Sequence, residues 1–306
     1  MARWNDASPA EKSGMRVAFF GLGLMGWPMA ANLVRAGLDV SVWTHSEGKA
    51  QRFADEHGAR AADTPSEAAE GADAAVTMLV DSPEVRDVLL GRKGAADALA
   101  AGAVVIDMST IAPTAAKELG ADLNERGLLF LEAPVSGSTP KATDGTLTIM
   151  AGGTPEAFGR ARPLLEVMGE KIVQVGPQGH GQLAKLLTNT MGAVHAAVLA
   201  ESVAVVERAG LDRDAFMEVA ANSAGASGVL ALKGPPMFDH AFEPVLFKLE
   251  HMLKDIRYTV EEARALGVEL QMGALAERLY SQAAAAGHGE EDFAAILTVA
   301  EGQNVA

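Results

Sequence analysis

Gly21-Leu22-Gly23-Leu24-Met25-Gly26 follows directly on the apolar run Arg16-Val17-Ala18-Phe19-Phe20. This is a G-x-G-x-x-G motif at the point where a first strand would pass into a first helix. Its first glycine makes a tight turn, its second lets the backbone approach a pyrophosphate, and its third allows close packing of helix on strand. Pro28 and Gly37 fit the start and the end of that helix. The stretch predicts a dinucleotide site; an ordinary glycine-rich turn is the alternative.

Composition narrows the class of protein. A chain of 306 residues is long for one core and indicates two domains. It has no cysteine, which excludes disulfides and thiol chemistry, and its seven histidines show no metal-ligand spacing. The formal net charge is −15, no basic stripe is visible, and no signal peptide or membrane-length apolar run is evident. We expect a cytoplasmic protein without a metal, nucleic-acid or membrane partner.

The first half of the chain alternates short apolar runs with helical patterns. This alternation predicts βαβ units and a mostly parallel, Rossmann-type sheet. After Gly179 the strand signals end, and a long apolar helical pattern runs to Glu207. We therefore expect an α/β domain, a long interdomain helix and an all-α domain. The expected boundaries are 1–14 for a mobile N-terminal extension, 15–178 for the NAD(P)-binding domain and 179–306 for a substrate and dimerisation domain.

The end of the second predicted strand bears on the choice between NAD and NADP. NAD enzymes place an acid there for the ribose 2′-hydroxyl, and NADP enzymes avoid that charge. The strand ends in Thr44-His45-Ser46, with no acid at this position. These three residues are expected to bind the cofactor as donors to its 2′-phosphate, with Lys49 or Arg52 a helical turn further on. The pattern favours NADP, with NAD as the alternative.

A candidate catalytic pair lies near the start of the long helix. Lys185 and Asn189 are four residues apart and project from one face. A desolvated lysine can exchange a proton with a hydroxyl or carbonyl oxygen. An exposed lysine and an ordinary helical asparagine would fit the same spacing.

At this point the chain resembles the β-hydroxyacid dehydrogenase family, which includes 3-hydroxyisobutyrate dehydrogenase, tartronate semialdehyde reductase and the glyoxylate/succinic semialdehyde reductases. The resemblance covers residues 15–300 and rests on several motifs in the family's order. After the glycine loop with Pro28-Met29-Ala30 and Asn32-Leu33, these are Asp107-Met108-Ser109-Thr110, Glu132-Ala133-Pro134-Val135-Ser136-Gly137, Gly145-Thr146-Leu147, Met150-Ala151-Gly152-Gly153, Lys185 with Asn189, and Phe247 and Leu249 with Lys254-Asp255.

The resemblance implies a role for each matching residue. Lys185 is expected as the general acid/base, Asn189 as the residue that orients the substrate, and Ser136 and Gly137 as the loop that binds its carboxylate. It also implies a cofactor role for Met78 and Leu79, which would lie over the cofactor, and for Thr110, beside the nicotinamide ribose. Lys254 is expected to reach the cofactor or the substrate, and Asp255 beside it to bind the substrate.

The expected activity is hydride transfer between a small, 3-hydroxyisobutyrate-like β-hydroxy acid and its semialdehyde. Ser138 stands where many members have glycine, and Thr44-His45-Ser46 where NADP-using members often have Asn-Arg followed by Ser or Thr, so the substrate and the phosphate contacts can differ.

An imine reductase-like enzyme, a 6-phosphogluconate-type enzyme and a non-catalytic NADP-binding sensor are the alternatives. Lys185 counts against the first, and the short chain counts against the second. The long apolar helix predicts a homodimer or a dimer of dimers.

Overall fold

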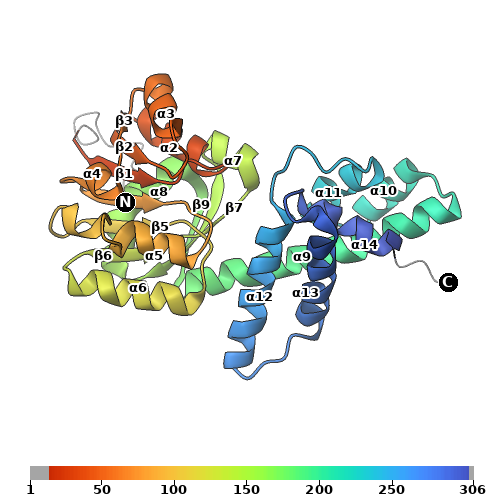
Figure 1. Ribbon diagram of the computed structural model, residues 1–306. Coiled ribbons are helices and arrows are strands. Elements are labelled where there is room, and N and C mark those ends of the chain that lie inside the picture. The colour runs from red at the N-terminus through yellow and green to blue at the C-terminus, as the bar shows by residue number, and fades with distance from the viewer. Residues whose placement is uncertain (1–13, 303–306) are drawn as a thin grey trace. The chain divides into compact units, whose positions relative to one another are not determined.

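The computed structural model describes residues 14–302. The chain forms two compact units that divide between Lys185 and Leu186. The first is an α/β unit and the second is helical (Figure 1). The predicted N-terminal extension lies outside the described residues, apart from Gly14.

A nine-stranded sheet forms the centre of the first unit. The strands are β1 (Arg16–Phe20), β2 (Asp39–Trp43), β3 (Arg60–Ala61), β4 (Ala74–Thr77), β5 (Val104–Asp107), β6 (Leu129–Glu132), β7 (Val135–Ser136), β8 (Leu147–Gly153) and β9 (Gly169–Gly176). Their order is β3-β2-β1-β4-β5-β6-β8-β7, and β9 pairs with β8. The first six strands run parallel, whereas β8 is antiparallel to β6 and β7. This order confirms the predicted Rossmann-type sheet.

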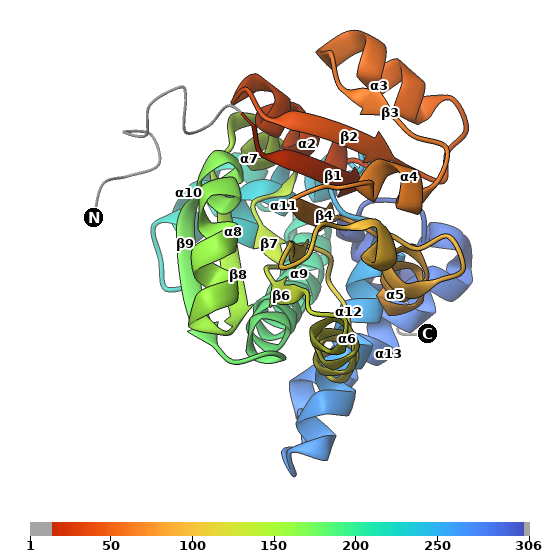
Figure 2. The same cartoon turned by 90° about the vertical axis from the view of Figure 1, so that its left-hand side faces the viewer.

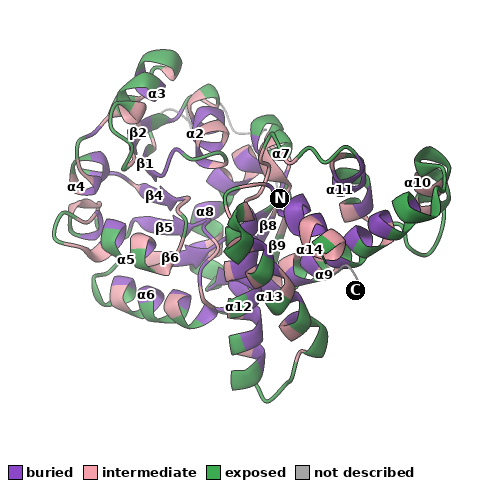
Figure 3. Cartoon of the chain, turned by 45° about the vertical axis from the view of Figure 1, so that its right-hand side comes forward, coloured by how far each residue is buried: buried purple, intermediate pink, exposed green. Residues whose placement is uncertain are grey.

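Helices cover both faces of this sheet (Figure 2). They are α2 (Gly26–Arg35), α3 (Lys49–His57), α4 (Pro65–Ala69), α5 (Ser82–Leu90), α6 (Pro113–Glu125), α7 (Ser138–Asp144) and α8 (Pro155–Met168), with a 3₁₀ turn η2 (Ala96–Ala98). Val17 and Phe19 belong to the buried cluster that includes residues of α2 and α8, while Ala18 and Phe20 belong to the cluster that includes residues of α4, α5 and α6. Both faces of a strand are therefore buried, which explains the continuous apolar runs in the sequence. In Figure 3 the central strands are accordingly purple.

The second unit contains helices throughout its described part. Its elements are most of α9 (His180–Ala209), α10 (Arg213–Ala221), α11 (Gly228–Phe238), α12 (Leu249–Ala265), α13 (Gln271–Ala283), α14 (Leu297–Gly302) and the short turns η3 (Ala284–His288) and η4 (Phe293–Ile296). The helices agree with the all-α domain that the sequence predicts, and α11 is the one whose sequence argues most against a helix. That helix contains Pro235 and Pro236, residues that normally end a helix. Here they occupy its last turn.

A buried ion pair lies in the core of the second unit. Lys233 Nζ is 2.7 Å from Asp292 Oδ1, and the two side chains are only 2% and 5% exposed. Asp292 also accepts backbone N–H bonds from Leu246, Phe247 and Ala294. The pair thus connects α11 to the segment that leads into α12.

By length and composition α9 could cross a membrane, which the sequence analysis did not anticipate. A single helix of this kind is weak evidence for a membrane span, and 44% of its most apolar window is buried inside the structure. The exposed apolar side chains of α9 are Leu187, Met191, Val198 and Val205.

Candidate active site

The glycine loop between β1 and α2 has little room for side chains. A Cβ on Gly21, whose φ is +100°, would lie 2.2 Å from the carbonyl oxygen of Met78, and a Cβ on Gly26 would lie 1.8 Å from that of Gly21. A Cβ on Gly23 would meet nothing within 4 Å. The outer glycines therefore permit close packing, while the middle one leaves its backbone open to a ligand. The loop fits a pyrophosphate at the start of α2, as the motif predicts.

A cationic cavity of about 470 Å³ lies beside this loop. It is lined by Gly23 and Leu24 of the loop and by Trp27. Arg35, Lys49, Arg52 and His57 also line it, and the Arg52 guanidinium lies 5.1 Å from the centroid of the Trp27 ring. Thr44, His45 and Ser46 do not line this cavity; the His45 ring packs against Trp43 at 4.6 Å between centroids. Lys49 and Arg52 of α3 thus line the same cavity as the glycine loop, which the sequence alone did not show.

The cofactor segments predicted after β4 and β5 lie side by side, because these strands pair in parallel. Leu79 N–H donates to the hydroxyl of Ser109 over 2.9 Å. Thr77 donates to the buried Asp107 carboxylate over 2.7 Å. These bonds hold the Met78-Leu79 loop against the segment that carries Thr110.

The predicted substrate loop follows β6. Ser136 is exposed at the end of β7, where it pairs with Thr148 of β8, and Gly137 precedes α7 with a φ of +142°. That φ favours glycine. The hydroxyl and the following backbone N–H groups are donor types suited to a carboxylate.

The first turn of α9 is fixed to the sheet by residues whose role the sequence analysis did not identify. Gln182 is fully buried; its side chain donates to Ser109 O over 2.9 Å and accepts from Ile111 N–H over 3.1 Å. Glu132, at the end of β6, accepts from Gly181 N–H over 2.6 Å. Lys185 follows within the next turn and is only 8% exposed. Glu132 begins the motif Glu132-Ala133-Pro134-Val135-Ser136-Gly137, whereas Gln182 belongs to none of the motifs, and spacing gave no reason to select either residue.

In the second unit, three predicted site residues form one connected group. The Asn189 side-chain amide donates to Asp255 Oδ2 over 2.6 Å, and Lys254 Nζ lies 3.0 Å from Asp255 Oδ1. Asp255 is 1% exposed, and Lys254 is 18% exposed and 5.2 Å from the centroid of the Tyr258 ring. The structure thus joins α9 to α12 through Asp255, which was predicted as a substrate-binding residue but not as a partner of Asn189.

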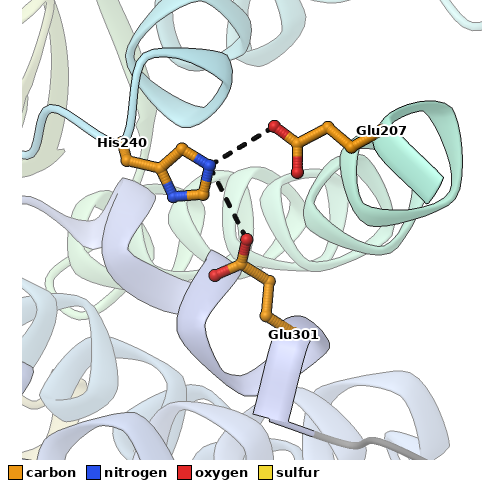
Figure 4. Close-up of side chains that lie close together, drawn as sticks. All are labelled: Glu207, His240 and Glu301. Carbon is orange, nitrogen blue, oxygen red and sulfur yellow. Dashed lines mark hydrogen bonds and ion pairs between the residues drawn. The ribbon is translucent and has the colours of Figure 1, made fainter. Parts of the chain in front are cut away.

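The structure also brings together a histidine and two glutamates that the sequence analysis did not connect. His240 Nε2 lies 3.3 Å from Glu207 of α9 and 3.7 Å from Glu301 of α14 (Figure 4). All three side chains are at least one-third exposed. His240 is able to pair with both carboxylates when it is protonated, so the group links α9 to α14.

Two family models together match almost all of the described chain. The NAD binding domain of 6-phosphogluconate dehydrogenase matches residues 16–176. The NAD-binding domain of NADP-dependent 3-hydroxyisobutyrate dehydrogenase matches residues 179–300.

Individual proteins are similar over nearly the whole chain. The 3-sulfolactaldehyde reductase of Escherichia coli is 35% identical over 92% of this chain and 94% of that protein. The NAD-dependent L-serine dehydrogenase of Pseudomonas aeruginosa is 37% identical over 92% of this chain and 96% of that protein. Among solved structures, a 3-hydroxyisobutyrate dehydrogenase from Salmonella typhimurium matches with a TM-score of 0.85 and 30% identity, over 94% of this chain and 100% of that one.

The fold, the glycine loop and these similarities define an NAD(P)-dependent oxidoreductase. The chain belongs to the β-hydroxyacid dehydrogenase family, as the order of its motifs predicted.

Proposed function

We propose that this protein interconverts a small β-hydroxy acid and its semialdehyde, with Lys185 as the general acid/base. The observation that carries the proposal is the burial of Lys185, 8% exposed, in a helix turn bonded to the Thr110 segment through Gln182. Lysine is rarely buried unless it is paired, and a general acid/base has to be positioned within reach of the proton that it exchanges.

In the proposed reaction one residue transfers the proton, and others bind and orient the substrate. In the oxidative direction Lys185, as the neutral amine, takes the hydroxyl proton while hydride leaves the same carbon. In reduction its ammonium returns the proton to the carbonyl oxygen. The nicotinamide, when bound, accepts or supplies the hydride. Ser136 and the backbone after Gly137 bind the carboxylate, and Asn189 orients the reacting oxygen.

NADP is the proposed cofactor in preference to NAD. The end of β2 carries no acid, and the cavity beside the glycine loop contains Lys49 and Arg52, which suit a phosphate. The comparisons include both a family model named after an NADP-dependent 3-hydroxyisobutyrate dehydrogenase and an NAD-dependent L-serine dehydrogenase. Thr110, Met78 and Leu79 are proposed to flank the nicotinamide half, with Lys254 as a further contact.

We also propose that the protein is a homodimer that pairs through α9. Leu187, Met191, Val198 and Val205 are 42–64% exposed and recur at intervals of four and seven residues, so they lie on one side of the helix. A second copy of this chain would cover that apolar face. We further propose the cytoplasm as its location.

A substrate panel tests the activity. Small hydroxy acids, among them 3-hydroxyisobutyrate, L-serine and glycerate, and small semialdehydes are assayed with NAD(H) and NADP(H) by nicotinamide absorbance. We expect turnover of at least one acid and its semialdehyde, with a lower KM for NADP(H). Cofactor binding without turnover of any member would favour a sensor, and turnover of cyclic imines alone would favour an imine reductase.

A further inference from the structure

Glu132 is a buried carboxyl group that the proposed chemistry does not use. Its side chain is fully buried at the end of β6, where Oε1 accepts from the N–H groups of Gly181 at 2.6 Å and Gln182 at 3.4 Å. Two glycines make room for it. A Cβ on Gly152 would lie 2.1 Å from Glu132 Oε1, and a Cβ on Gly181 would lie 3.0 Å from the same atom.

Some surroundings of this carboxyl group disfavour its ionised form, and others favour it. Burial, and to a smaller extent the nearby Asp107 of β5, raise the pKa of Glu132 to about 7, against the lowering effect of backbone N–H groups at the start of α9. Oε2 has no hydrogen-bond partner within the described residues. Two further titratable side chains lie near this helix start: Lys117 of α6 packs against Gly179, and His180 packs against Gly176.

The group that Glu132 binds is the turn that leads to Lys185. Gly181 and Gln182 precede this lysine by four and three residues, so all three lie on neighbouring turns of one face. An ionised carboxylate at a helix start forms charge-assisted bonds with free N–H groups, which a neutral acid forms more weakly. The charge on Glu132 therefore sets how firmly the first turn of α9 is held.

We propose that Glu132 is a positioning residue whose ionised carboxylate holds the first turn of α9, and with it Lys185, in its working place. Uptake of a proton by this carboxyl loosens the turn and lowers turnover. The kinetic part of this inference rests on the proposed function, because it takes Lys185 to be the proton donor and acceptor.

Ionisation of the buried Glu132 lowers the stability of the native state. A purely structural role would instead require Glu132 to stabilise the native state in its working form. The native state binds the Glu132 proton more tightly than the unfolded chain does, because folding raises this pKa. The contribution of Glu132 to stability therefore falls as the pH rises from about 4.5 to about 7. Glu132→Gln keeps the shape without the charge, so the variant should be at least as stable as the wild type at about pH 8.

The pH dependence of kcat in wild type and Glu132→Gln is the kinetic test. Wild-type kcat should rise along a limb with a midpoint near pH 7. The variant should lose this limb, and its kcat at about pH 8 should fall about tenfold, the scale of one charge-assisted bond. The cofactor Kd should not change, and Glu118→Gln, which alters an exposed carboxyl on α6, should retain the limb. An unchanged limb in Glu132→Gln would overturn the proposal, and so would a marked loss of stability at pH 8.

A second measurement needs neither turnover nor a variant that folds. In the wild-type protein labelled with ¹³C at glutamate carboxyls, the most strongly shifted carboxyl should titrate near pH 7. Hydrogen exchange of the backbone amides of Gly181 and Gln182, corrected for the intrinsic rate, should be slower above this midpoint than below it. Equal protection on both sides would refute the positioning role. If the protection changes while no substrate is turned over, the proposed function fails and the inference about α9 stands.

Discussion

The side-chain amide of Asn189 donates a 2.6 Å hydrogen bond to the buried Asp255 carboxylate, across 66 positions of sequence. This bond fixes the orientation of the Asn189 amide, because Nδ2 is committed as a donor. The same carboxylate is paired with Lys254 through its other oxygen. Asp255 therefore orients two of the proposed site residues.

Asp255→Asn should weaken substrate positioning while leaving the cofactor bound. The substitution replaces an acceptor of charge-assisted bonds with a neutral amide, so we expect kcat/KM for the acid to fall at least about tenfold. Steady-state kinetics with both substrates measure the change. Glu261→Gln, at an exposed position of the same helix, is the control and should leave kcat/KM as it is. A variant with wild-type kcat/KM would refute this role of Asp255.

Lys49→Ala and Arg52→Ala should weaken the binding of NADP(H) and spare that of NAD(H). Both cations line the cavity beside Gly23, and each charged contact to a phosphate contributes about tenfold to affinity. The Kd values for both reduced cofactors, from fluorescence titration, make the comparison. Arg92→Ala, an exposed arginine outside this cavity, is the control. Equal losses for the two cofactors would contradict the assignment to the 2′-phosphate.

Val198→Glu should dissociate the proposed dimer. Val198 is 52% exposed on the apolar face of α9, and a carboxylate there cannot be buried against a second copy without an unpaired charge. The molar mass from light scattering after gel filtration should fall to that of one chain. Val219→Glu, which alters an even more exposed valine on α10, should leave the mass of the dimer unchanged. A mass of one chain for the wild type would refute the dimer.

Lys233→Met should destabilise the second unit strongly. Removing one partner of a buried ion pair leaves an uncompensated charge on Asp292, at a cost of about 3 kcal/mol or more in the free energy of unfolding. Guanidinium denaturation followed by circular dichroism gives the value. Arg257→Met, in a more exposed pair with Glu277, should change it far less. Similar losses in the free energy of unfolding for Lys233→Met and Arg257→Met would contradict the prediction that the buried pair contributes more than the exposed one.

The sequence predicted the parts of the fold that depend on local patterns. The glycine loop, the apolar strands, the long helix after Gly179 and the helical character of the rest of the chain were apparent, because each pattern is contained in neighbouring residues. The short elements β3, β7, α4 and α7 were too brief for periodicity to detect, and α11 was hidden by Pro235 and Pro236.

Long-range contacts in the candidate site could not be predicted in the same way. Lys185 and Asn189 were predicted from their spacing and from the family's motifs. Glu132 acquires its partners only when β6 meets the start of α9, 49 positions later, and Gln182 bonds a segment 71 to 73 positions earlier. A lone buried carboxyl and a helical glutamine have no sequence signature of such a contact.

The role of Lys185 as the general acid/base is tested by the activity of Lys185→Ala, with its cofactor affinity measured in parallel. We expect an unchanged Kd for NADPH and a kcat reduced by about 100-fold to 10,000-fold, the usual contribution of a general acid/base. Lys171→Ala, at an exposed position in β9, should behave as the wild type does. A Lys185→Ala enzyme that binds NADPH normally and retains more than about a tenth of wild-type kcat would contradict the assignment of Lys185 as the proton donor and acceptor.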